Sequence, residues 1–98
     1  MNIVFDPLAL AEMEDASEFY DVKSPGLGER FKKEIKRGLK LIRDHPEAWA
    51  KENKDLRRYL LHAFPYKIIY SIEPEYIYIV AVAHCHRQPD YWIDRIIQ

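Results

Sequence analysis

The fold is decided by residues 66–83, which have the sequence YKIIYSIEPEYIYIVAVA. Two runs in this stretch, Tyr66–Ile72 and Tyr76–Ala83, alternate with the two-residue period that is typical of β-strands. The three residues between them, 73–75, are too few for the crossover that parallel strands need. A third alternating run, Leu56–Phe64, comes just before them. The sequence therefore predicts a three-stranded antiparallel meander.

Two helices are predicted upstream of the meander by apolar residues that recur every three or four positions. In the first, which spans Leu8–Val22 and follows an N-cap and a proline at Asp6-Pro7, these residues are Ala9, Met13, Ala16 and Tyr20. In the second, which follows the similar pair Ser24-Pro25 and ends at His45-Pro46, they are Leu27, Phe31, Ile35, Leu39 and Ile42.

The two predicted helices carry opposite charge. The first is acidic and has no basic residue before Lys23. The second carries a basic outer side formed by Arg30, Lys32, Lys33, Lys36, Arg37, Lys40 and Arg43. Because the connection between the helices is short, we expect them to pack antiparallel, and their opposite charge favours this pairing.

The remaining segments complete the predicted domain. Asn2–Phe5 is a short strand expected to join the sheet, and residues 47–55 are a polar linker anchored by Trp49. The segment Tyr91–Ile97 is expected to dock on the core through Trp92, Ile93, Ile96 and Ile97. Residues 1–98 thus predict a single α+β domain, in which an N-terminal strand and an antiparallel helical hairpin pack on an antiparallel sheet of about four strands, followed by a short C-terminal segment.

Residues two apart on a strand share one face of the sheet. The apolar set formed by Ile77, Ile79, Ala81 and Ala83 is therefore expected to face the helical hairpin. Arg57 and Arg58 point to opposite faces, so at least one of them can lie on the open face of the sheet, beside either Lys67 or Tyr66. Such a basic, tyrosine-rich surface could hold a phosphate or a base, although an ordinary solvated sheet face has the same composition.

Composition excludes several classes of protein. A chain of 98 residues supports one core, and a net charge of -1 argues against coating nucleic acid through bulk charge. The start of the chain shows no secretory signal, and its longest apolar run, Ile77–Ala83, is far below the roughly 20 residues of a membrane helix. A single cysteine fits a reducing compartment. We therefore expect a soluble, cytoplasmic protein.

Polar and aromatic residues gather in residues 84–92. His84 and His86 share one side of an extended chain, as zinc ligands do, but Cys85 points away and no second ligand pair exists. The same geometry argues against Cys85 as a nucleophile with a neighbouring histidine as its base. A turn fixed by Arg87 and Asp90 is the plain structural alternative. Neither a metal nor a cofactor is predicted, and no phosphate-loop or hydrolase motif occurs.

Several of these segments together resemble the RelE/ParE family of bacterial toxins from type II toxin-antitoxin systems. The resemblance rests on Arg57-Arg58-Tyr59, Phe64-Pro65-Tyr66, Ile77–Val82, the ending His84-x-x-Arg87-x-Pro89-x-Tyr91-Trp92, and Ser24-Pro25-Gly26-Leu27-Gly28 before a basic helix. It covers nearly the whole chain. It implies two helices against an antiparallel sheet and a cognate antitoxin as partner, matching the layout derived above.

The family divides into two activities. ParE-like toxins inhibit DNA gyrase and need no catalytic site, whereas RelE-like toxins enter the ribosome and cleave mRNA without a metal. The ending of this chain resembles the ParE side, and its low net charge gives weak long-range attraction to the ribosome. Gyrase inhibition is therefore favoured, with RelE-like cleavage, or a non-toxic antitoxin-binding module, as the alternatives.

The resemblance also implies site residues. If the protein is RelE-like, Arg58 and Lys67 would hold the phosphate, His84 or His86 would transfer a proton, Arg87 would stabilise charge, and Tyr91 would stack or act as an acid. The antitoxin is expected to wrap an amphipathic segment across the helices and the sheet edge, where an acidic stretch could meet the basic helix at Arg30, Lys33, Lys36, Arg37 and Lys40.

Overall fold

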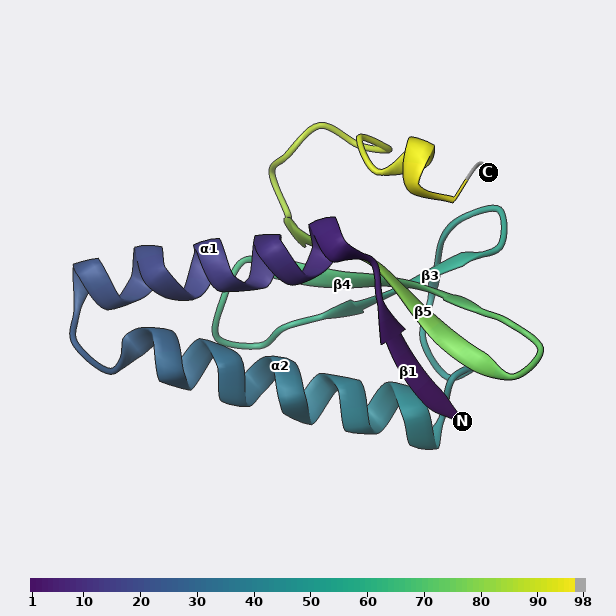
Figure 1. Cartoon of the computed structure of the whole chain (residues 1–98), viewed down its shortest axis with the longest axis horizontal. Helices are drawn as coiled ribbons and strands as arrows, with labels where there is room; N and C mark the ends of the chain where they lie inside the picture. Colours follow the sequence, from purple (N-terminus) through teal and green to yellow (C-terminus); the bar gives the residue numbers. More distant parts are fainter. Residues whose placement is uncertain (97–98) are drawn as a thin grey trace.

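The computed structural model of the protein describes residues 1–96 and has the predicted α+β architecture (Figure 1). Its strands are β1 (Asn2–Phe5), β2 (Lys51–Asn53), β3 (Leu56–Leu60), β4 (Tyr66–Ile72) and β5 (Tyr76–His84). Its helices are α1 (Pro7–Lys23), α2 (Leu27–Asp44) and a short 3-10 helix at Ile93–Arg95. No helix within this part of the chain is long and apolar enough to cross a membrane.

The sheet has the strand order β1-β5-β4-β3-β2. The predicted meander is confirmed, because β3, β4 and β5 pair antiparallel in chain order. The N-terminal strand joins the sheet as expected and lies parallel to β5. The sheet gains one strand over the prediction, since part of the polar linker, Lys51–Asn53, pairs with β3. These three polar residues show no apolar alternation, so only the neighbouring strand edge identifies them.

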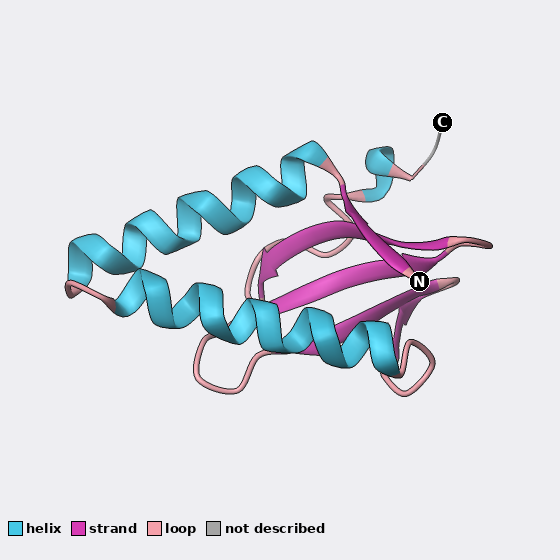
Figure 2. Cartoon of the chain, turned by 60° about the horizontal axis from the view of Figure 1, so that its bottom comes forward, coloured by secondary structure: helices cyan, strands magenta, loops and turns pink. Residues whose placement is uncertain are grey.

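The helical hairpin covers one face of the sheet (Figure 2). Asp6 caps α1 as predicted, accepting a 2.9 Å hydrogen bond from the backbone of Leu8. The prediction that Ser24-Pro25 starts the second helix is wrong. Ser24 instead closes α1 by donating its backbone N–H to Tyr20, and α2 begins after Gly26, whose φ of 89° favours glycine.

A β-bulge in β5 reverses the predicted sides of its last residues. Ile79 pairs with Tyr70 and Ala81 with Ile69, so that Val80 is an extra residue in the ladder. Ile77 and Ile79 face the hairpin as predicted, but Ala81 and Ala83 face the opposite side. That side, which also bears Lys67, Ile69 and Ser71 of β4, is called the far face below.

The C-terminal segment packs on the far face (Figure 1). Trp92 is only 1% exposed and contacts the cluster of Leu56, Ile69, Val80, Ala81 and Ala83. Docking through Trp92 is thus confirmed, whereas Ile96 is 36% exposed and contributes little. The predicted contact of Ile97 lies outside the described residues. The two sides of the sheet therefore carry separate apolar clusters, one under the helices and one under the C-terminal segment.

Candidate functional site

Two side chains form hydrogen bonds with the edge of β5 where it extends beyond β1. Strand β1 pairs only with residues 76–79 of β5, which leaves the polar backbone groups that follow without a strand partner there. The Val82 N–H donates to Glu12 Oε1 at 3.0 Å, and Arg95 Nη1 donates to the Val80 carbonyl at 3.0 Å. Buried backbone groups need such partners. Glu12 and Arg95 thus take the place of a longer strand at this edge.

The Glu12 carboxylate also gathers the C-terminal side chains. Arg95 binds it at two points, with Nη1–Oε1 at 2.9 Å and Nη2–Oε2 at 3.0 Å. Tyr91 donates its hydroxyl to Oε2 at 2.7 Å, and Arg87 Nη1 lies 3.9 Å from the same oxygen. We call these four residues, Glu12, Arg87, Tyr91 and Arg95, the Glu12 cluster.

Electrostatics within the Glu12 cluster favour the protonated forms of its donors. Burial, followed by the hydrogen bond to Glu12, raises the pKa of the Tyr91 phenol well above its ordinary value. The hydrogen bond to Glu12 also raises the pKa of Arg95. The Arg87 guanidinium stacks 3.8 Å from the centre of the Tyr91 ring. Tyr91 therefore keeps its proton and donates a hydrogen bond to Glu12.

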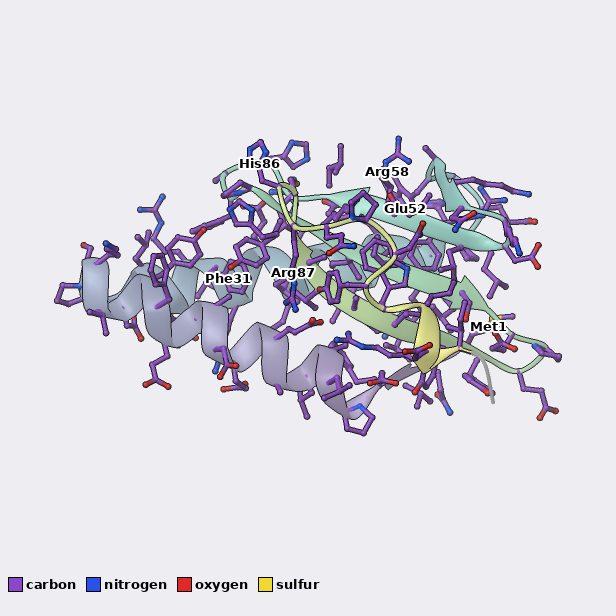
Figure 3. The ribbon with its side chains drawn as sticks, turned by 90° about the horizontal axis from the view of Figure 1, so that it is seen from above. Met1, Phe31, Glu52, Arg58, His86 and Arg87 are labelled. Atoms are coloured by element: carbon purple, nitrogen blue, oxygen red, sulfur yellow. The ribbon has the colours of Figure 1, made fainter. Side chains whose placement is uncertain are left out.

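Arg58 and Lys67 meet on the far face, as one option in the sequence analysis predicted. Glu52 joins them: its carboxylate lies 2.9 Å from Lys67 Nζ and 3.6 Å from Arg58 Nη1. Arg58 also donates to the Lys51 carbonyl, and Lys67 lies 5.5 Å from the Trp92 ring centre. Figure 3 shows Arg58 beside Glu52, whereas Arg87 lies apart from them next to the ribbon of α1. The Glu52 carboxylate thus neutralises part of the positive charge that Arg58 and Lys67 bring to the far face.

The two histidines form a third group. His84 lies on the helix side of the sheet, where its ring is 5.1 Å from that of Tyr66. Its Nδ1 accepts the backbone N–H of His86 at 3.1 Å, and the two rings are 5.4 Å apart. Cys85 is exposed between them. Over residues 1–96, no three His, Cys, Asp or Glu side chains gather in a way that could hold a metal ion.

The six residues predicted for RelE-like chemistry are therefore distributed over three places. Arg87 and Tyr91 belong to the Glu12 cluster, Arg58 and Lys67 surround Glu52, and the histidines contact each other. The Arg87 backbone N–H donates to the His84 carbonyl at 3.0 Å, but within residues 1–96 no side-chain hydrogen bond, ion pair or ring contact joins either histidine to the other two groups. This arrangement is best suited to holding the C-terminal segment on the sheet.

The residues predicted to bind the antitoxin form one exposed surface. Arg30, Lys33, Lys36, Arg37 and Lys40 all lie exposed on α2. None of these five makes an ion pair with any residue in 1–96. The nearby Glu34 is occupied, since it accepts the backbone N–H groups of His62 and Ala63. We call the five residues the α2 basic surface.

Three functional candidates were missed by the sequence analysis: Glu12, Glu52 and Arg95. Glu12 counted only as one of the acidic residues of the first helix, and Glu52 fell in the polar linker. Glu12 and Arg95 are 83 positions apart, so no local spacing connects them. Only the packing of α1 over the end of β5 brings them together.

Comparison with known proteins gives one family. Residues 3–89 match the family model described as "ParE toxin of type II toxin-antitoxin system, parDE". A solved structure described as the chromosomal ParDE TA system from P. aeruginosa has a TM-score of 0.65 and 13% identity, over 86% of this chain and 95% of that chain. At this identity the likeness shows the fold. No curated protein matches the chain.

Proposed function

The chain belongs to the ParE toxin family of type II toxin-antitoxin systems, and we propose that it arrests growth by inhibiting DNA gyrase and is neutralised by a cognate antitoxin. The family match over residues 3–89 is the observation that carries this proposal. Gyrase inhibition requires a binding surface, and the protein needs no bond-making chemistry of its own for it.

The partners that the candidate acid–base groups already have support a binding function rather than catalysis. A RelE-like site would need a proton donor, a base and a phosphate-binding cation around one substrate. Here the Tyr91 hydroxyl donates to Glu12 and Lys67 is paired with Glu52, and within residues 1–96 no side-chain hydrogen bond or ring contact joins either histidine to Tyr91 or Lys67. The RNase alternative would need these groups to leave their present partners.

The α2 basic surface supports the antitoxin half of the proposal. Five exposed cations without ion-pair partners in residues 1–96 attract an acidic chain, and charge complementarity of this kind speeds association and selects the partner. We assign to this surface an acidic, amphipathic segment of the antitoxin. Binding there should weaken as salt concentration rises.

Induction in cells tests the proposed target. The protein is expressed without its antitoxin, and plasmid supercoiling and amino-acid incorporation are measured in the same culture. Gyrase inhibition predicts loss of negative supercoiling and filamentous cells while translation continues at first. An immediate stop in translation with normal supercoiling would overturn the proposal, and co-expression of the antitoxin should remove every effect.

A further inference from the structure

A loop that is exposed along its whole length precedes the last turn of the chain. All six residues from Cys85 to Asp90 are exposed, and His86, Arg87 and Gln88 give this loop several hydrogen-bond donors. We call residues 85–90 the C-terminal loop. It leaves the sheet at His84 and is followed by the buried Trp92. The loop thus presents polar side chains from a fixed base.

The far end of the C-terminal loop is held by α1. Glu12 binds Tyr91 directly after the loop and Arg95 four residues later, and it approaches Arg87 within the loop. Its own side chain is 15% exposed and that of Arg95 is 11% exposed, so their ion pair is largely shielded from water. Asn53 adds a 3.1 Å hydrogen bond to Asp90. The loop's position therefore depends on contacts from other elements.

The ionic nature of this attachment points to a role beyond stability. Trp92 already buries an apolar side chain on the far face, and a neutral acceptor at position 12 could satisfy the Val82 N–H, so neither packing nor the strand edge requires a charge there. A shielded ion pair adds little net stability, because removing both charges from water offsets their attraction. It does fix direction, since a two-point guanidinium–carboxylate contact permits few geometries.

We propose that Glu12 is a positioning residue, which holds the C-terminal loop in the conformation that binds the toxin's target and is not needed for antitoxin binding. This inference rests on the proposed gyrase inhibition. A loop ordered before binding loses less conformational entropy in the complex, so it binds more tightly. Helix α2, which bears the α2 basic surface, lies on the other side of α1 from the C-terminal segment, and this separates the two binding tasks (Figure 1).

Glu12→Gln tests the proposal with the full-length protein. The amide keeps the size of the side chain but loses the charge, and it cannot accept from all the present donors. Glu14→Gln is the matched control, because Glu14 lies on the same helix and makes a single exposed ion pair with Lys32. Three quantities are measured: gyrase inhibition, antitoxin affinity, and the rate of trypsin cleavage after Arg87.

We expect Glu12→Gln to need at least about tenfold more protein for half-inhibition of gyrase, as misplaced binding groups commonly cost this much. Trypsin cleavage after Arg87 should accelerate, and antitoxin affinity should stay within about twofold, well under 1 kcal/mol. The control should match the wild type in all three. Full inhibition by a Glu12→Gln protein that is cleaved faster would overturn the proposal, as would equal loss of antitoxin affinity.

Growth arrest distinguishes a failure of the proposed function from a failure of the role assigned to Glu12. A wild-type protein that arrests growth without inhibiting gyrase contradicts the proposed function. A Glu12→Gln variant that arrests growth like the wild type contradicts the role of Glu12. If circular dichroism shows Glu12→Gln unfolded, Tyr91→Phe replaces it, since it removes one donor and keeps the ion pair. That variant is expected to lose part of the inhibition, and full inhibition would overturn the proposal.

Discussion

Ser17 of α1 and Gly28 of α2 are in direct contact where the helical hairpin closes. The Ser17 hydroxyl donates a 3.1 Å hydrogen bond to the Gly28 carbonyl, and the Gly28 N–H donates to Asp21 at 2.8 Å. A Cβ added at Gly28 would lie 2.2 Å from the Ser17 carbonyl oxygen. Position 28 therefore requires glycine because the two helix backbones approach so closely.

Gly28→Ala should destabilise the protein through this clash. Because both nearest groups belong to a packed helix, the hairpin must open, at a cost of roughly 2–3 kcal/mol. Gly26→Ala is the comparison: it meets no atom within 4 Å, but its φ of 89° makes alanine unfavourable by about 1 kcal/mol. Urea denaturation of both variants measures the difference. Equal stability of the two would contradict the close packing.

Tyr70 should make stability fall in alkaline solution. Burial raises the pKa of this phenol from 10.0 to about 12, and its hydroxyl donates to the Pro46 carbonyl at 2.6 Å. Above pH 10 the unfolded chain loses this proton while the folded protein retains it, so the contribution is complete below pH 10 and is lost as the pH rises to 12. At pH 11 the loss is about 1.4 kcal/mol.

The Tyr70→Phe variant isolates that effect. Other tyrosines also titrate in this range, but they do so in both proteins. The difference in the free energy of unfolding between wild type and Tyr70→Phe should therefore shrink from pH 8 to pH 11. A constant difference, measured by urea denaturation at each pH, would show that burial does not hold this proton.

The α2 basic surface should control antitoxin affinity. Reversing two of its charges with Lys36→Glu and Lys40→Glu is expected to weaken binding at least about tenfold at low salt, because like charges then face each other. The control carries the same change in net charge at the exposed residues Lys51 and Lys54. Titration calorimetry at two salt concentrations compares them. Equal weakening in both proteins would leave net charge, rather than this surface, as the cause.

His84→Gln should leave growth arrest intact. His84 contacts Tyr66 on the helix side of the sheet, and within residues 1–96 its side chain makes no hydrogen bond, ion pair or ring contact with Arg58 or Lys67 on the far face. A gyrase inhibitor needs no proton transfer at this position. Colony counts after induction measure the outcome, with antitoxin binding as the test of folding. Loss of arrest in a folded variant would instead favour proton transfer by His84.

The helices and the meander could be predicted because each follows a local rule. Phe31, Ile35 and Ile42 recur at helical spacing and are fully buried, and the strands alternate as the sheet requires. The start of α2 was misplaced because Ser24-Pro25 resembles a helix start, although the left-handed Gly26 sets the turn. Local patterns thus gave the two long helices and the three strands of the meander, but they missed β2, misplaced the start of α2, and extended β3 to Phe64 although it ends at Leu60.

Alternation alone could not predict which residues of β5 face the helical hairpin and which face the far side of the sheet. Val80 is apolar like its neighbours, so nothing in the sequence shows that it is the extra residue of a bulge. The Glu12 cluster was hidden for a different reason. Its members come from α1 and from the C-terminal segment, and only the incomplete cover of β5 by β1 creates the polar groups that they satisfy.

Inhibition of purified gyrase tests the central claim most directly. Relaxed plasmid, ATP and gyrase are incubated with increasing amounts of the purified protein, and supercoiled product is measured on gels, with and without excess antitoxin. We predict that supercoiling falls with the amount of protein and returns when antitoxin is added. Unchanged supercoiling at a large molar excess of folded protein, together with mRNA cleavage on purified ribosomes, would contradict the account.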